Sequence, residues 1–174
     1  MIKELKGLNP KNFKVLNRYY TKDDKKIYFS KEYADIQEVQ NIDVKSFEVL
    51  YFENIENKDD FGKDKNKVYL FGLELKDIKP EKFQVVKEPI TEKIIYVRDE
   101  NNLFVIFCDY FLGFNFVEPK KIENVDFKTL KWKSARELED KNGKYTVNGS
   151  VIDEDKIEIK FIKNRKKEKI LWKN

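Results

Sequence analysis

The chain has 174 residues and a formal net charge of +4, and 39% of its residues are charged, 40% hydrophobic and 14% aromatic. A chain of this length typically forms one domain with its own core, so we expect residues 1–174 to be a single domain. The sequence has no histidine and one cysteine, which excludes histidine-based catalytic triads, thiolate zinc sites and an intramolecular disulfide.

Other familiar site types are missing from the sequence as well. The six glycines are scattered, so there is no glycine-rich phosphate loop. The longest apolar run, residues 103–117, is interrupted by Asp109, Gly113 and Asn115, whereas a membrane-spanning helix needs about 20 apolar residues. The first residues show no signal-peptide pattern. We therefore predict a soluble cytoplasmic protein with no membrane span, no cofactor, no metal and no enzymatic activity.

In chain order, the first clear pattern is a short unit that recurs four times. It reads aromatic, any residue, basic, Asp, three mostly polar residues, apolar and aromatic. Its copies lie at residues 20–28, 61–69, 96–104 and, in a degenerate form, 139–145. Val, Ile, Phe and Tyr on both sides of a cluster of Asp, Asn and Lys indicate a β-hairpin, and Asp and Asn suit its turn.

A second unit, Phe-x-Val-Leu, alternates with the hairpin unit. Its copies begin at Phe13, Phe47 and Phe83, with a weaker copy at Phe127. The first three copies follow segments that read like the first turn of a helix, at residues 9–12, 43–46 and 79–82. Each repeat is therefore expected to contain a hairpin, a short helical turn and one further strand.

Together the two units predict a mainly β fold: an antiparallel meander of repeated β-hairpins, about ten strands in all, with short helical turns between repeats. The repeats are expected at residues 9–46, 47–82, 83–126 and 127–150, followed by a closing basic hairpin at residues 151–174. A short helix is also expected within residues 33–46, because apolar residues recur there every third position. The pattern is compatible with a barrel, a sandwich or a solenoid.

The pattern of the two repeated units resembles that of a known family. Residues 63–69 read Lys-Asp-Lys-Asn-Lys-Val-Tyr, and together with the Pro-x-x-Phe-x-Val units they resemble the bacterial DKNYY family. The resemblance covers roughly residues 9–149 and implies a fold built from such repeats. Phe29 and Leu70 stand where the signature has its second tyrosine. The family has no established general function, so the resemblance carries no catalytic residue over to this chain.

The acidic turns have two readings, a calcium loop and ordinary turn chemistry. The pairs Asp64 and Asn66, Asp99 and Asn101, and Asp140 and Asn142 echo the start of a calcium loop. A full loop also needs a third acidic position and a late bidentate Glu, and these are missing. Turn chemistry is therefore favoured. Cys108 lies in an apolar strand-like run, the opposite of the electropositive setting that a reactive thiolate needs, so it is expected to pack in the core.

The carboxyl-terminal segment is strongly basic. Residues 156–174 contain eight basic and two acidic residues, and Lys163, Arg165, Lys166 and Lys167 fall in a predicted turn. This basic turn is a candidate binding site for nucleic acid or an anionic surface. The alternative is a solvated turn without a ligand.

Three phenylalanines form a second candidate binding site. Phe111, Phe114 and Phe116 lie beside Gly113 and Asn115, where a loop would expose them as an apolar patch. The alternative is that the three rings belong to the core.

The sequence favours a non-enzymatic binding module that acts by protein–protein interaction. Its most concrete form is a small bacterial immunity protein that neutralises a partner toxin. One alternative is nucleic-acid or anionic-surface binding through the basic carboxyl-terminal hairpin, and a second is carbohydrate or surface-ligand binding by the repeats. The prediction names no catalytic residue and no metal ligand.

Overall fold

The computed structural model describes residues 10–30, 36–52, 60–87, 93–109, 115–150 and 157–164. Within these ranges the elements are strands, apart from one short 3-10 helix, η1 (Pro10–Asn12). The mainly β prediction is thus confirmed. No helix in these ranges has the length and apolarity that crossing a bilayer requires.

The described strands form four antiparallel sheets in which neighbours in sequence pair, except that β13 of the third sheet pairs with β11. The first sheet contains β1 (Lys14–Val15), β2 (Tyr20–Lys22), β3 (Ile27–Ser30) and β4 (Ile36–Glu38). The second contains β5 (Glu48–Val49), β6 (Phe61–Lys63), β7 (Val68–Leu70) and β8 (Leu73–Glu74). The third contains β9 (Gln84–Lys87), β10 (Ile94–Arg98), β11 (Leu103–Asp109), β12 (Asn115–Phe116) and β13 (Lys120–Ile122). The fourth contains β14 (Lys131–Trp132), β15 (Glu137–Glu139), β16 (Gly143–Asn148) and β17 (Glu158–Lys163).

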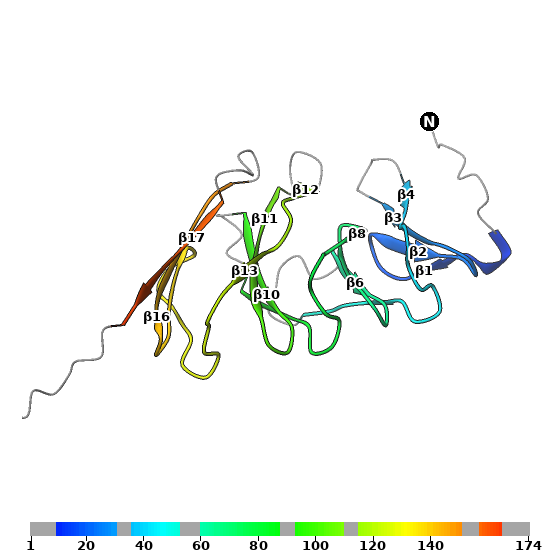
Figure 1. Ribbon diagram of the computed structural model, residues 1–174. Helices are drawn as coiled ribbons and strands as arrows, with labels where there is room; N and C mark the ends of the chain where they lie inside the picture. Colours follow the sequence, from blue (N-terminus) through cyan, green and yellow to red (C-terminus); the bar gives the residue numbers. More distant parts are fainter. Residues whose placement is uncertain are drawn as a thin grey trace, which may run out of the picture.

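The four sheets follow one another along an elongated molecule, from the blue first sheet to the orange strands of the fourth (Figure 1). Each sheet is one copy of the repeat, and its two central strands are the hairpin of that copy. A repeat of this size cannot bury its apolar residues alone, so neighbouring copies stack and share a core. The sequence is compatible with a barrel, a sandwich or a solenoid. The structure is a linear array of stacked sheets, as in a solenoid.

Two apolar cores lie between the sheets, and the third sheet separates them. One face of its strand β11 contributes Phe104, Ile106 and Cys108 to the core shared with the first two sheets. The opposite face contributes Leu103, Val105 and Phe107 to the core shared with the fourth sheet. Because both faces are covered, every residue of β11 is buried, which explains its continuous apolar run from Leu103 to Cys108.

Three positions of the hairpin face the following repeat, and they are apolar in the first three copies. Two of the three positions lie directly opposite each other, one on each strand of the hairpin. The third position lies on the second strand, two residues before the member of that pair. The sets are Tyr20, Ile27 and Phe29; Phe61, Val68 and Leu70; Tyr96, Leu103 and Val105; and Glu137, Lys144 and Thr146. The first nine side chains are buried. Those of the fourth copy are polar, and no further described sheet covers them.

Two of these aromatic residues also bond to the next repeat through their hydroxyl groups. The Tyr20 hydroxyl donates to the carbonyl of Asp60 and accepts from the N–H of Gly72, both at 3.1 Å. The Tyr96 hydroxyl donates to the carbonyl of Ala135 at 2.7 Å. These bonds satisfy the buried hydroxyls and fix the spacing between neighbouring sheets.

The structure corrects several details of the predicted elements. The prediction of about ten strands is too low, because the last strands of the first three sheets were not foreseen. The helix expected within residues 33–46 is wrong: β4 is a strand paired with β3, and residues 44–46 form a turn. In the fourth repeat, residues 127–129 are a turn and the strand is β14. The described links between repeats contain no helix, and the one described helical turn, η1, precedes β1.

The closing basic hairpin is also organised differently over the part that the structure describes. Its first strand, β17, pairs along its whole length with β16 and therefore completes the fourth sheet. The predicted basic turn and second strand lie outside the described residues.

Candidate functional site

The Asp of each hairpin turn forms the same local hydrogen bonds in all four repeats. Its Oδ1 accepts from the backbone N–H groups two and three residues later, at 2.7–3.0 Å. The four carboxylates belong to Asp23, Asp64, Asp99 and Asp140, and each is at most 6% exposed. This is the turn chemistry that the Asp-x-Asn pattern predicts, because a short carboxylate side chain can cap its own turn.

The second oxygen of the carboxylate reaches outside the turn. In the second repeat, Asp64 Oδ2 accepts from the hydroxyl of Tyr69 at 3.0 Å and from the backbone N–H of Asp43 at 2.8 Å. In the fourth repeat, the corresponding donors are the hydroxyl of Tyr145, at 3.0 Å from Asp140 Oδ2, and the backbone N–H of Asp126. The carboxylate therefore ties the hairpin to the link that precedes its repeat.

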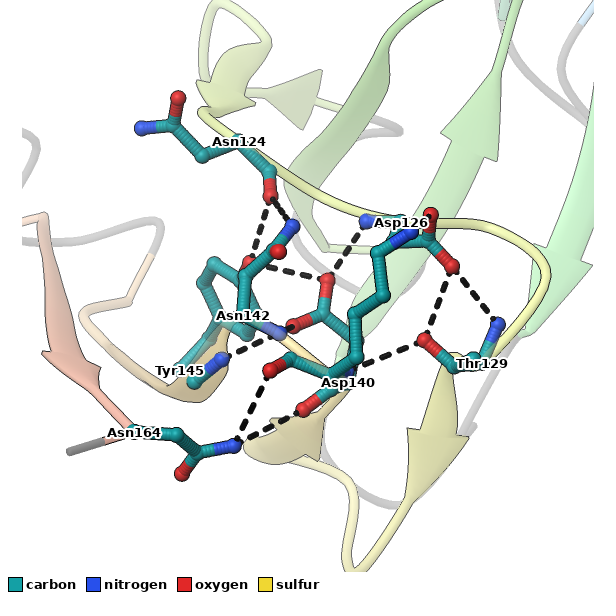
Figure 2. A network of polar contacts seen from close by, with 9 residues as sticks. Asn124, Asp126, Thr129, Asp140, Asn142, Tyr145 and Asn164 are labelled. Atoms are coloured by element: carbon teal, nitrogen blue, oxygen red, sulfur yellow. Dashed lines mark hydrogen bonds and ion pairs between the residues drawn. The ribbon is translucent and has the colours of Figure 1, made fainter. Parts of the chain in front are cut away.

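Figure 2 shows how the network extends in the fourth repeat. Asp126 Oδ1 accepts from the N–H and the hydroxyl of Thr129, and that hydroxyl accepts from the N–H of Lys141 at 3.0 Å. The Tyr145 hydroxyl also lies 2.9 Å from the carbonyl of Asn124, so its single proton is shared between two acceptors.

The second repeat reproduces this network with different residues. Asp43 Oδ1 accepts from the N–H and hydroxyl of Ser46, and the Ser46 hydroxyl accepts from the N–H of Lys65 at 3.1 Å. The Lys65 ammonium forms an ion pair with Asp43 at 2.8 Å, and the Lys141 ammonium does the same with Asp126 at 2.6 Å. Two distant segments of the sequence thus build the same junction.

The third repeat replaces the tyrosine and compensates for its loss. Phe104 stands at the position of Tyr69 and has no hydroxyl. The side-chain amide of Asn102 donates instead to Asp99 Oδ2 at 3.2 Å, and the backbone N–H of Lys79 also donates to this carboxylate. The acceptor capacity of the buried carboxylate is therefore still used.

The hydrogen bonds lower the pKa of the turn carboxylates Asp64 and Asp99 against the effect of burial. Burial alone raises the pKa of Asp64, but the N–H donors and the Tyr69 hydroxyl outweigh it and lower the pKa overall. For Asp43, the hydrogen bonds from Lys65 and Ser46 lower the pKa to about 2. Burial and the neighbouring Asp64 raise the pKa of the Tyr69 hydroxyl. A carboxylate held in this way serves as a structural acceptor of hydrogen bonds.

The structure places the predicted site residues unevenly. Lys163 lies at the end of β17 and is exposed, while Arg165, Lys166 and Lys167 lie outside the described residues. Phe111 and Phe114 also lie outside them.

Phe116 is the described member of the predicted phenylalanine patch. It lies on β12, is half-buried, and its ring centroid is 6.5 Å from that of Phe71 in the first core. Cys108 is fully buried in the same core. Among the described residues, no three acidic or cysteine side chains gather as a metal site.

A surface feature that the sequence did not reveal is the position of the exposed large apolar side chains. Every one of them in the described ranges lies on, or within two residues of, the first or last strand of a sheet, which we call the outer strands. They are Phe13, Val15, Ile36, Tyr51, Leu73, Phe161 and Ile162. Recognising the strands β4 and β8 in the sequence would have been the signal for two of them, Ile36 and Leu73.

Comparison with known proteins gives one finding. The family model of the DKNYY family matches residues 20–170. Searches of curated proteins and of solved structures gave no match. The match includes the four Asp-centred turns and their stacked sheets, and it covers most of the chain. The chain therefore belongs to the DKNYY family.

Proposed function

We propose that this protein is a non-enzymatic binding module that acts by protein–protein contact through its outer strands. The observation that carries the proposal is the restriction of exposed large apolar side chains to those strands. Val15 is 69% exposed, Tyr51 63% and Ile162 65%. Side chains of this kind stabilise a complex when a partner covers them.

The backbone of an outer strand supports the same kind of contact. One side of such a strand has no paired neighbour among the described strands, so its N–H and C=O groups can pair with an extended segment of another chain. Strand addition supplies hydrogen bonds, and the exposed apolar side chains supply the contact area. A partner that matches both features is a protein.

The buried Asp network supports a binding role over an enzymatic one. The turn carboxylates make up the most regular polar cluster in the described residues, and backbone N–H groups and hydroxyls occupy their oxygens. Groups used in this way hold the repeats together. The surface for partners is then the outer strands, which the network leaves free.

The proposal in its most concrete form is a bacterial immunity protein that neutralises a partner toxin. The net charge of +4 favours a partner that is not itself strongly basic, because complementary charge steers association. Cells that express a toxin encoded beside this protein should grow again when this protein is co-expressed. Variants of the outer strands should fail to restore their growth.

The binding proposal is tested by affinity capture from a lysate of the native host with three versions of the protein. These are the wild type, the variant Tyr51→Lys/Ile162→Lys, and the control Asn101→Lys at an exposed turn. We expect a stoichiometric protein that is retained at high salt by the wild type and the control and lost with the outer-strand variant. Recovery of nucleic acid alone, released by salt, would instead support the basic carboxyl-terminal segment as the binding site.

A further inference from the structure

One cross-strand pair occupies the same place in every repeat and can be compared across the four copies. It joins the residue before the turn Asp to its neighbour on the first strand of the sheet. In the second repeat the pair is Glu48 and Lys63, whose charged groups are 3.1 Å apart. In the fourth it is Lys131 and Glu139, again of opposite charge.

The third repeat has a polar version of the same pair. The Arg98 guanidinium donates to the side-chain carbonyl of Gln84 at 2.9 Å. Three of the four copies therefore carry complementary groups at this place, as expected for directly opposite residues of an antiparallel pair.

The first repeat departs from this rule. Lys14 on β1 lies directly opposite Lys22 on β2. Neither ammonium forms an ion pair within the described part of the chain. Like charges in this arrangement repel each other and weaken the pairing of the two strands. The first repeat thus carries an uncompensated positive charge where the other copies have a complementary pair.

Phe13, the apolar residue before Lys14, is exposed because no described sheet precedes the first one and packs against its ring. Phe47 and Phe83, which stand at the position of Phe13 in the next two repeats, pack against the preceding sheet. The ring of Phe47 is 5.3 Å from that of Tyr20, and the ring of Phe83 is 5.7 Å from that of Phe61. Phe13 is 38% exposed, compared with 5% for Phe47 and 9% for Phe83.

We propose that the outer strand of the first repeat, residues 13–15 together with Lys22, binds an acidic extended segment of a partner protein. This proposal rests on the proposed function and names its surface and the chemistry of its partner. A strand added to the outer edge of β1 would place a carboxylate beside Lys14, with Lys22 one strand further in. Its neighbouring side chains would be apolar, because Phe13 and Val15 alternate with Lys14 along the chain.

The charge also argues against two other occupants. A second copy of the chain that paired through β1 would bring two more lysines to the same place and increase the repulsion. Nucleic acid would use the positive charge but would leave the exposed Phe13 and Val15 without a matching strand. An acidic and apolar protein segment satisfies both features at once.

The experiment is selection of a random twelve-residue peptide library on the immobilised protein, with wild type and Lys14→Glu/Lys22→Glu in parallel. We expect the wild type to enrich peptides that alternate acidic and apolar residues, and the charge-reversed variant to enrich basic ones. A fluorescent copy of the best acidic peptide should bind the variant at least about tenfold more weakly. Near-ultraviolet circular dichroism and thermal melting show that the variant is folded.

Several outcomes would overturn the proposal. They are a wild-type selection without acidic peptides, equal affinity of the acidic peptide for both versions, and a dimer of the wild type that dissociates in Phe13→Lys. The variant Glu48→Lys, which alters the same pair in the second repeat, is the matched control and should keep the wild-type affinity. If affinity capture loses its partner with Tyr51→Lys/Ile162→Lys but keeps it with Lys14→Glu/Lys22→Glu, the proposed function holds and this surface is wrong. Failure of every version to retain a protein contradicts the proposed function itself.

Discussion

The hydroxyl of Tyr69 donates to the carboxylate of Asp64 at 3.0 Å, and Tyr145 and Asp140 repeat this bond at the same distance 76 residues later. In both cases the two residues are five positions apart and join the turn of a hairpin to its second strand. The same carboxylate holds the link that precedes the repeat. The signature residues of the repeat thus connect local turn structure to the stacking of the sheets.

Loss of the Asp64 carboxylate should destabilise the protein strongly. Asp64→Ala leaves buried N–H groups without an acceptor and removes the nearer acceptor of the Tyr69 hydroxyl, and we expect a decrease of about 3 kcal/mol in the free energy of unfolding. Urea denaturation measures this value. Glu81→Ala, an exposed residue in a turn, is the control and should change stability by less than about 0.5 kcal/mol. Equal effects of the two substitutions would contradict the structural role of Asp64.

Removal of a single hydroxyl tests the bond between tyrosine and carboxylate. Tyr145→Phe should lower the free energy of unfolding by about 1–2 kcal/mol, because the Asp140 carboxylate and the Asn124 carbonyl lose a shared donor. Tyr51→Phe is the matched control, since Tyr51 is exposed and its hydroxyl makes only a 3.4 Å contact. Thermal melting compares the two. A melting temperature for Tyr145→Phe that equals the wild-type value would show that the bond does not stabilise the fold.

The lowered pKa values predict a loss of stability in acid. The pKa of Asp43 falls from its ordinary 3.8 to about 2, and those of Asp64, Asp99 and Asp126 are also lowered. A carboxylate with a lower pKa in the folded state stabilises the fold fully above its unfolded pKa, and this contribution disappears as the pH falls through the folded pKa. The free energy of unfolding should therefore decrease between roughly pH 4 and pH 2.

Urea denaturation at a series of pH values measures this acid dependence. Asp43→Asn/Asp64→Asn should be less stable than the wild type at pH 7 and should show a shallower decrease on acidification. Parallel curves for the two proteins would mean that other carboxylates cause the acid dependence.

The repulsion between Lys14 and Lys22 should make a single charge reversal stabilising. Lys14→Glu creates the complementary pair that the second repeat has naturally, and we expect the free energy of unfolding to rise by about 0.5 kcal/mol. The converse change, Glu48→Lys, replaces the pair of opposite charge with a like-charged one and should lower it by a similar amount. Chemical denaturation at low salt measures both. A stabilised Lys14→Glu variant that has lost its acidic peptide would show that positive charge is kept for binding.

The polar face of the fourth sheet should prevent further stacking. Glu137→Tyr/Lys144→Ile/Thr146→Phe installs residues of the kind that the first three repeats use at these positions, and we expect the variant to self-associate. Size-exclusion chromatography with light scattering measures its mass. The matched control, Glu137→Gln/Lys144→Gln/Thr146→Ser, should keep the wild-type mass. A variant with unchanged mass would show that polarity at these positions does not limit the array.

The amino-acid sequence by itself determined the features that depend on near neighbours in the chain. Each turn carboxylate bonds to N–H groups two and three residues away, so its spacing in the sequence predicted the turn, and β-branched and aromatic neighbours predicted the hairpin. The recurrence of both units predicted a repeat fold and the resemblance to the DKNYY family, which the family match confirms.

Only the tertiary structure decided the features that depend on distant residues. The strand β4 forms because β3 offers it a partner, although its own apolar spacing suggested a helix, and contact between segments overrides such local preferences. The opposition of Lys14 and Lys22 follows from the register of two strands, and the exposure of Phe13 follows from the absence of a stacked neighbour among the described sheets. Hydrogen bonds within a turn depend on residues that are close in the sequence, whereas strand register and burial arise only when the sheets come together.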